Sequence, residues 1–208
     1  MVAITDPKIE KYLMNLSAEH DRHILEMERL AKEKNFPIVD RLVGRLLFVL
    51  TKLRKPNLIV ELGSGFGYSA YWFSRALEKG KIVLTEYDKK NLDHAKKTFR
   101  ESGLIRKAEF RVGNAIEIAG GYRNIDILFI DIDKHQYLAA VKTLMPNLSR
   151  NALVIADNSL WYGRVTGRKR DRDTLGIKRF NEFMFAGSDF FTTILPVRDG
   201  VLVAYKLS

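Results

Sequence analysis

The chain has 208 residues, of which 46% are hydrophobic and 29% are charged, and its formal net charge at pH 7 is +10. This composition is typical of a soluble globular protein with a substantial core. Cysteine is absent from the sequence, which excludes disulfides, zinc thiolate sites and thiol nucleophiles. The positive charge favours an anionic partner, either a small acidic substrate or a nucleic acid, although a solvated basic surface would have the same composition.

No apolar run reaches the length of a membrane-spanning helix, and the longest that resembles one, Leu46–Leu50, is short. The amino terminus carries acidic residues early and lacks the apolar core of a signal peptide. We therefore expect a cytoplasmic protein without a membrane partner.

The amino-terminal residues 1–55 are expected to form a helical cap. Apolar residues at helical spacing amid charges predict one helix from Asp6 to about Lys34. Pro37 interrupts this pattern, and a second amphipathic helix is expected over Asp40–Leu53. Residues 56–208 then alternate strands and helices with no linker or internal repeat, so we expect a single domain.

The core is expected to be a doubly wound α/β fold around a mostly parallel seven-stranded sheet, because repeated strand–helix units place helices on both faces. The last two strands are joined by Pro196–Gly200, which is short enough for a hairpin, so the last strand should be antiparallel. The expected strands are Leu58–Glu61, Lys81–Glu86, Glu109–Val112, Ile125–Ile130, Ala152–Ala156, Phe190–Leu195 and Val201–Lys206, and the expected helices are Tyr68–Lys79, Asp88–Ser102, Ala115–Ala119, Lys134–Leu148 and Thr174–Ala186.

A glycine-rich turn follows the first core strand in the sequence LIVELGSGFGYS, residues 58–69. Its three alternating glycines suit a strand–loop–helix unit in which a ligand approaches the backbone closely. A dinucleotide fingerprint would need glycine where Tyr68 stands, and the Gly-Lys-Ser/Thr sequence of a phosphate-binding P-loop does not occur here. Glu61 at the strand end would repel a pyrophosphate but suits a ligand with an ammonium group and sugar hydroxyls, such as S-adenosylmethionine. The alternative is a tight turn that binds no ligand.

Acidic residues follow three further strands, and such positions meet at one edge of a parallel sheet. Glu86 can accept hydrogen bonds from both hydroxyls of a ribose; alternatively it is an acid favoured by the dipole of the next helix, a role that Asp88 already fills. Asp131 ends the fourth strand and Asp157-Asn158 the fifth, and we expect these strands to be neighbours. Two carboxylates and an amide oxygen form a hard oxygen site suited to Mg²⁺ or Mn²⁺, whereas either aspartate alone would more often cap a turn.

Several motifs follow one another along the chain. They are the segment Pro37–Val49 that leads to the first core strand, then VELGSGFGYSAYW, LTEYD, RVGNA, LFIDIDKHQY, LVIADN and the terminal RDGVLVAYK. Each is a moderate signal alone. In this order, over nearly the whole chain, they resemble the class I S-adenosylmethionine-dependent methyltransferases. More narrowly, the chain is similar to the catechol and caffeoyl-CoA O-methyltransferase-like family.

The resemblance implies a role for each candidate residue. It makes Lys134 the general base, although a solvated lysine in a first helical turn is the alternative. His135 is itself expected to be exposed and without a role. Relatives commonly form dimers, so a homodimer is expected, with the amphipathic amino-terminal helices as a possible surface. The implied cofactor-binding residues are Val39, Glu61, Gly63 and Ser69 for the methionine moiety, Glu86 for the ribose, and Gly113, Asn114 and Ala115 for the adenine, with Asp131 beside them. The implied ligands of a divalent metal (Mg²⁺, or else Mn²⁺ or Ca²⁺) are Asp131, Asp157 and Asn158. Asp131 is also expected to be catalytic, together with Lys134.

The resemblance further implies metal-dependent transfer of a methyl group to a hydroxyl of a small phenolic acceptor of the catechol or caffeoyl type. Some relatives methylate hydroxylated wobble uridines in tRNA, so a tRNA methyltransferase is the main alternative. An acyl-CoA is a third possible anionic partner. A module that binds a cofactor or nucleotide without catalysis is the alternative from another class, and the glycine spacing disfavours an NAD dehydrogenase.

The sequence also departs from this family. Asp133 stands where the mammalian catechol enzyme has an aromatic gate residue, and Thr193 where that enzyme has a substrate-orienting glutamate, so catechol itself is doubtful as the acceptor. Trp161 and Tyr162 could form an acceptor wall instead, or could only pack the loop. The basic run RVTGRKRDR, residues 164–172, could bind phosphates, or could be an ordinary charged surface loop.

Overall fold

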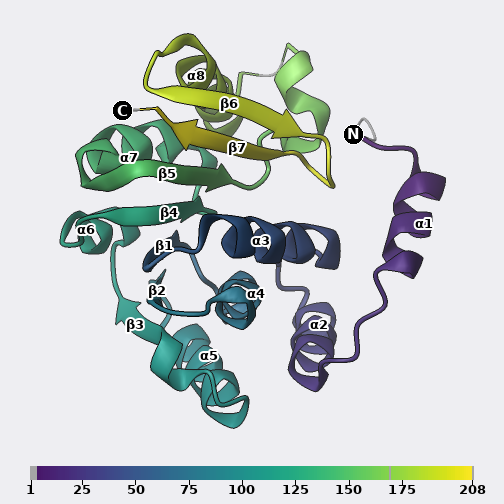
Figure 1. The fold of residues 1–208 in the computed structure, drawn as a ribbon. Helices are drawn as coiled ribbons and strands as arrows, with labels where there is room; N and C mark the ends of the chain where they lie inside the picture. Colours follow the sequence, from purple (N-terminus) through teal and green to yellow (C-terminus); the bar gives the residue numbers. More distant parts are fainter. Residues whose placement is uncertain (1–3, 169, 208) are drawn as a thin grey trace.

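In the computed structural model, which describes residues 4–168 and 170–207, the strands form one seven-stranded sheet in the order β3-β2-β1-β4-β5-β7-β6 (Figure 1). Strands β1 to β5 pair in parallel, whereas β7 is antiparallel to both β5 and β6. The doubly wound fold and its antiparallel last strand are therefore confirmed. The strands are β1 Leu58–Leu62, β2 Lys81–Glu86, β3 Ala108–Val112, β4 Ile125–Ile130, β5 Leu148–Ala156, β6 Phe190–Leu195 and β7 Val201–Lys206.

Helices cover both faces of the sheet, which explains why the central strands are continuously apolar. Successive residues of a strand point to opposite faces, so Ile59 and Ile127 pack with helices α2 to α5, and Val60 and Leu128 pack with α6 to α8. Each such side chain stabilises the fold by about 1.5–3 kcal/mol on burial. The helices are α1 Pro7–Leu16, α2 Arg22–Lys34, α3 Arg41–Arg54, α4 Tyr68–Ala76, α5 Lys89–Glu101, α6 Ala115–Gly120, α7 Tyr137–Leu144 and α8 Arg172–Ala186, with 3₁₀ turns η1 Ile105–Lys107, η2 Lys134–Gln136, η3 Met145–Asn147 and η4 Trp161–Thr166.

The single helix expected from Asp6 to Lys34 is wrong, because the chain forms α1 and α2 with a break between them. The carboxylate of Asp21 accepts hydrogen bonds from the backbone N–H groups of His23 and Ile24, and so starts a new helix. No residue of α1 is buried, and Figure 1 shows this helix at the outer edge of the molecule, away from the sheet.

The helix expected over Lys134–Leu148 is also divided. It begins as η2, continues as α7 and ends in η3, because Pro146 cannot continue the backbone hydrogen bonds of an α-helix. Strand β5 then starts at Leu148, earlier than the expected Ala152, and a register irregularity separates its first pairing with β4 from the rest. Throughout the described ranges, no helix has both the length and the apolar character needed to cross a membrane.

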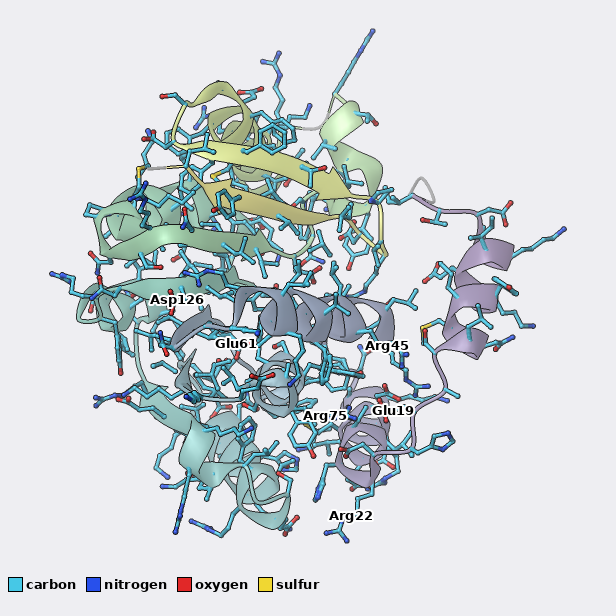
Figure 2. The ribbon with its side chains drawn as sticks, viewed as in Figure 1. Glu19, Arg22, Arg45, Glu61, Arg75 and Asp126 are labelled. Atoms are coloured by element: carbon cyan, nitrogen blue, oxygen red, sulfur yellow. The ribbon has the colours of Figure 1, made fainter. Side chains whose placement is uncertain are left out.

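A buried carboxylate joins several elements at the amino ends of the strands. Asp126 is 6% exposed and accepts hydrogen bonds from Arg54 Nη2 at 2.6 Å and from the backbone N–H of Asn57 at 2.7 Å. Ser149 Oγ donates to the same carboxylate at 2.8 Å. These bonds connect the end of α3 and the start of β1 to β4 and β5. Figure 2 shows Asp126 at the start of β4, while Glu61 lies further along β1.

Replacing this carboxylate should lower stability without changing the opposite edge of the sheet. Asp126→Ala leaves a half-buried guanidinium and two backbone N–H groups without their acceptor, so we expect the free energy of unfolding to fall by about 3 kcal/mol. Urea unfolding measures the change. Asp93→Ala, which removes an exposed ion pair with Lys89, is the control and should change stability by less than about 0.5 kcal/mol. Equal effects of the two substitutions would contradict this account.

Candidate functional site

A cavity of about 460 Å³ opens at the carboxyl ends of the parallel strands, beside the point where the strand order reverses between β1 and β4. Most of the site residues expected from the sequence line it. Glu61 and Gly113 do not: Glu61 is fully buried behind the wall, and Gly113 precedes the lining residue Asn114. The expected residues in the lining are Val39, Gly63, Ser69, Glu86, Asn114, Ala115, Asp131, Lys134, Asp157 and Asn158.

The glycine loop forms one wall and approaches β4 very closely. Gly63 has a φ of +83°, and a Cβ atom at this position would lie 2.2 Å from the carbonyl oxygen of Asp131. Only glycine satisfies both conditions. The backbone N–H of Gly65 donates to Glu86 Oε2 at 2.9 Å, and the N–H of Asp88 donates to Oε1 at 3.0 Å. The glycine loop thus fixes the carboxylate of Glu86 at the cavity.

Glu61 is connected to the cavity through Ser69. The hydroxyl of Ser69 donates to Glu61 Oε1, while Oε2 is buried and has no hydrogen-bond partner among the described residues. Burial raises the pKa of Glu61 to about 7, because an ionised carboxylate loses its hydration there. The cavity is therefore backed by an acid that a cationic group would help to ionise.

The segment between α2 and α3 forms another wall, so the helical cap takes part in the site. Phe36 and Val39 line the cavity beside Tyr68 of α4. The hydroxyl of Tyr68 donates to Glu28 Oε1 at 2.7 Å, and Arg41 Nη2 donates to the other carboxylate oxygen of Glu28 at 2.5 Å. Side chains of α2, α3 and α4 are thereby joined directly behind the lining.

Asp131 and Asp157 follow the neighbouring strands β4 and β5, as expected. Asp157 is 1% exposed; its Oδ2 accepts a long hydrogen bond of 3.4 Å from Arg198 Nη1, and its Oδ1 is buried without a partner in the described chain. Burial and the nearby charge of Asp131 raise the pKa of Asp157. Lys134 Nζ donates to Asp131 Oδ1 at 2.8 Å and to the carbonyl oxygen of Ile132 at 3.2 Å.

Lys134 is buried, not solvated, and its neighbours explain why. Its Nζ lies 5.1 Å from the ring centre of Tyr137 and 5.8 Å from that of Trp161, within the range of cation–π contacts. Helix α8 packs closely against the same turn, since a Cβ at Gly176 would lie 2.4 Å from the Cα of His135. The expected exposure of His135 is wrong, because this side chain is half-buried and its Nδ1 lies 2.9 Å from Asp173 Oδ1.

Two aromatic residues of η4 also line the cavity. Trp161 and Tyr162 have φ values of +47° and +54°, a conformation that bulky residues rarely adopt, and their ring centres lie 5.6 Å apart.

Asp133 lines the cavity as well. Thr193 is exposed on β6 and is not among the lining residues, so it does not take the place of a substrate-orienting residue.

Sequence reasoning missed two residues of the hairpin between β6 and β7. Arg198 lines the cavity, and Asp199 is 2% exposed and bonded to the segment that follows β5. The terminal motif RDGVLVAYK contains both residues, but its pattern alone assigns neither of them a role. Arg168 and Arg170 of the basic loop are exposed, whereas Lys169 lies outside the described residues.

Within the described ranges, no group of three or more histidine, cysteine, aspartate or glutamate side chains is arranged to hold a metal ion. The expected ligand set has only two carboxylates, those of Asp131 and Asp157, and its third member is the amide of Asn158.

The buried carboxyl of Glu61 should make stability depend on pH. Its pKa is 4.5 in an ordinary setting and about 7 in the folded protein, so between these values the folded state holds a proton that the unfolded chain releases. Stability from this group is therefore lost as the pH rises towards 7. Glu61→Gln keeps the acceptor for Ser69 and removes the titration. Relative to this variant, the wild type should lose on the order of 2 kcal/mol between about pH 5 and pH 8 in urea unfolding. A difference that stays constant with pH would contradict the prediction.

Comparisons with known proteins agree with this geometry. A family model described as O-methyltransferase matches residues 14–207. A catechol O-methyltransferase of Niastella koreensis is 30% identical over 198 residues, covering 91% of this chain and 90% of that protein. A solved methyltransferase from Geobacter sulfurreducens is 39% identical with a TM-score of 0.88 and full coverage of both chains. The O-methyltransferase TomG from Streptomyces achromogenes, involved in tomaymycin synthesis and solved in complex with SAM, is 26% identical with a TM-score of 0.87 over 97% of this chain and 96% of that one. The chain belongs to the O-methyltransferase family.

Proposed function

We propose that this enzyme transfers a methyl group from S-adenosylmethionine to a hydroxyl of a small phenolic acceptor with adjacent oxygens, with a divalent metal at the acceptor. The observation that carries the proposal is the buried Oδ1 of Asp157, which has no hydrogen-bond partner among the residues that the structure describes and lies beside Asp131 and Lys134. These groups line a cavity that also contains the glycine loop and Glu86. Its volume of about 460 Å³ lies within the range of small-molecule sites.

The glycine-loop side of the cavity suits the methyl donor, whose methyl group is bonded to a positively charged sulfur. Glu86 is held by two backbone N–H groups and can accept hydrogen bonds from the ribose hydroxyls. Asn114 and Ala115 would contact the adenine, and Gly113 would contribute only by positioning them. The ammonium group of the donor would lie near Gly63 and Ser69, where Glu61 supplies negative charge through the Ser69 hydroxyl. That SAM is bound by the related TomG supports this assignment.

The acceptor side suits a hard cation. Within residues 4–168 and 170–207, nothing forms a hydrogen bond with the buried Oδ1 of Asp157, and such an atom normally has a hydrogen bond or an ion. With Asp131 and the amide oxygen of Asn158 it gives an all-oxygen donor set, which Mg²⁺, Mn²⁺ and Ca²⁺ prefer. These three residues would hold the ion. Its positive charge would lower the pKa of the acceptor hydroxyl.

Lys134 would receive the proton of the acceptor hydroxyl. A phenol has an ordinary pKa of about 10 and is a weak nucleophile while protonated. The Nζ of Lys134 is held by Asp131 and by a backbone carbonyl, so its position at the cavity wall is fixed. Trp161 and Tyr162 would pack against the acceptor ring and orient its oxygen towards the donor methyl.

Methyl transfer to caffeate or catechol, measured with a radiolabelled donor and Mg²⁺, tests the proposal. We expect activity to be abolished by EDTA and to fall by about 100-fold or more in Asp157→Ala, because the variant lacks the buried oxygens. Asp93→Ala, on the surface of α5, is the control and should keep full activity. Calorimetry with S-adenosylmethionine should show that donor binding survives in both variants. Full activity in EDTA would remove the metal from the mechanism.

The basic loop supports a second candidate, a tRNA substrate with a hydroxylated wobble uridine. Exposed Arg168 and Arg170 lie close in sequence to Trp161 and Tyr162 of the cavity wall, so phosphates could be bound while a base stacks on an aromatic ring. An acyl-CoA would use the same charges. The tRNA hypothesis predicts RNA binding that weakens steeply with salt and weakens further in Arg168→Gln/Arg170→Gln, measured by filter binding. Binding independent of these charges would eliminate it.

A homodimer remains part of the proposal. Helix α1 has no buried residue and exposes several large apolar side chains, which a second copy of the chain could cover. The exposed apolar residues of α1 are Ile9, Tyr12, Leu13 and Leu16.

A cytoplasmic location also stays a prediction.

A further inference from the structure

The turn that follows β5 has an unusual backbone. Asn158, Trp161 and Tyr162 all have φ values near +50°, in the left-handed region. Asparagine tolerates this conformation, whereas for the two aromatic residues it costs about 1–2 kcal/mol each. Such a turn persists only when surrounding contacts hold it, and residues of this kind often lie at functional sites.

The contacts that hold this turn come from the hairpin between β6 and β7, some forty residues later in the sequence. The backbone N–H of Leu160 donates to the carbonyl oxygen of Asp199 at 2.9 Å, and that of Ser159 donates to Gly200 at 2.8 Å. Gly200 has a φ of +84°, and a Cβ there would lie 2.5 Å from Cγ of Leu160. The two segments therefore pack at backbone contact.

The side chain of Asp199 adds two bonds from the same direction. Its Oδ1 accepts from the backbone N–H of Tyr162, and its Oδ2 accepts from Asn158 Nδ2 at 3.2 Å. With the carboxylate 2% exposed, few waters can compete for these bonds. One carboxylate thus contacts both ends of the turn.

The bond to Asn158 determines which amide atom faces the cavity. A carboxylate accepts hydrogen bonds but cannot donate them, so only the NH₂ group of the amide can face Asp199. The carbonyl oxygen is then the amide atom left for a ligand in the cavity that Asn158 lines. A cation requires this oxygen and would be repelled by the NH₂ group.

We propose that Asp199 is a positioning residue, which fixes the amide of Asn158 with its oxygen towards a divalent cation in the cavity. This inference rests on the proposed function, because it assigns the amide oxygen to that cation. Asp199 does not touch the cation or the acceptor. It acts through Asn158 and through the turn that carries Trp161 and Tyr162.

The substitution Asp199→Asn tests the orientation. The new amide can still accept from the N–H of Tyr162 through its oxygen, but it then presents NH₂ to Asn158. Asn158 must turn its own oxygen towards position 199 and its NH₂ towards the cavity. We expect the affinity for Mn²⁺, measured by calorimetry without donor or acceptor, to fall at least about tenfold. Thermal unfolding and the emission of Trp161 in a Trp72→Phe background should show that the turn is retained.

A double variant separates orientation from general damage. In Asn158→Asp/Asp199→Asn, the carboxylate at 158 has oxygens on both sides: one accepts from the new amide and the other faces the cavity. Mn²⁺ affinity should return to within about threefold of the wild type. Asp126→Asn is the matched control, since it alters a buried, multiply bonded carboxylate at the other end of the sheet and should leave Mn²⁺ affinity unchanged.

The outcomes are distinguishable. Mn²⁺ binding by Asp199→Asn equal to the wild type would overturn the inference and leave the proposed function standing. A double variant as weak as the single one, or a loss in Asp126→Asn of the same size, would show that Asp199 is only structural. Failure of the wild type itself to bind Mn²⁺ would overturn the metal in the proposed function, and this inference with it.

Discussion

The parallel hydrogen-bond ladder of β1, β4 and β5 is the constraint on which the site depends. The ladder continues past the strand ends, because the N–H of Asp131 donates to Leu62 at 2.9 Å and the N–H of Asp157 donates to Ile130 at 3.2 Å. Neighbouring strands lie about 4.8 Å apart, so the two aspartates are held close together on one edge. Gly63 completes the constraint from the side of β1, where any side chain would meet the carbonyl of Asp131.

The charges of the cavity differ from those of the whole chain. The net charge is +10, yet the lining has more acidic than basic residues, so the excess positive charge lies elsewhere. Burial raises the pKa values of Glu61 and Asp157, and repulsion by the charge of Asp131 raises both further. A cationic donor and a metal ion would both relieve this repulsion, which is why one cavity can suit two positive ligands. The charged lining residues are Glu86, Asp131, Asp133, Asp157 and Asp173 against Lys134 and Arg198.

The fold and most of the lining could be predicted from the sequence because both follow from local patterns. Apolar runs such as Ile125–Ile130 identify buried strands, and acids just after them meet at one edge of the sheet. Contacts made only after folding could not be predicted in this way. Asp199 reaches the site through a distant hairpin, His135 is covered by α8, and Trp161 adopts a backbone conformation that its side chain disfavours. Helical periodicity alone does not show the break before α2, because it does not reveal that the side chain of Asp21 caps the start of a new helix.

The close packing at Gly176 links the amino-terminal part of α8 to chemistry at its neighbour. Because the helix backbone rests directly on the turn that carries Lys134, a side chain even as small as a methyl group would displace that turn. The turn that carries Lys134 and the amino-terminal part of α8 are therefore in direct backbone contact. Substitutions in the loop between Trp161 and α8 would leave this backbone contact at Gly176 in place.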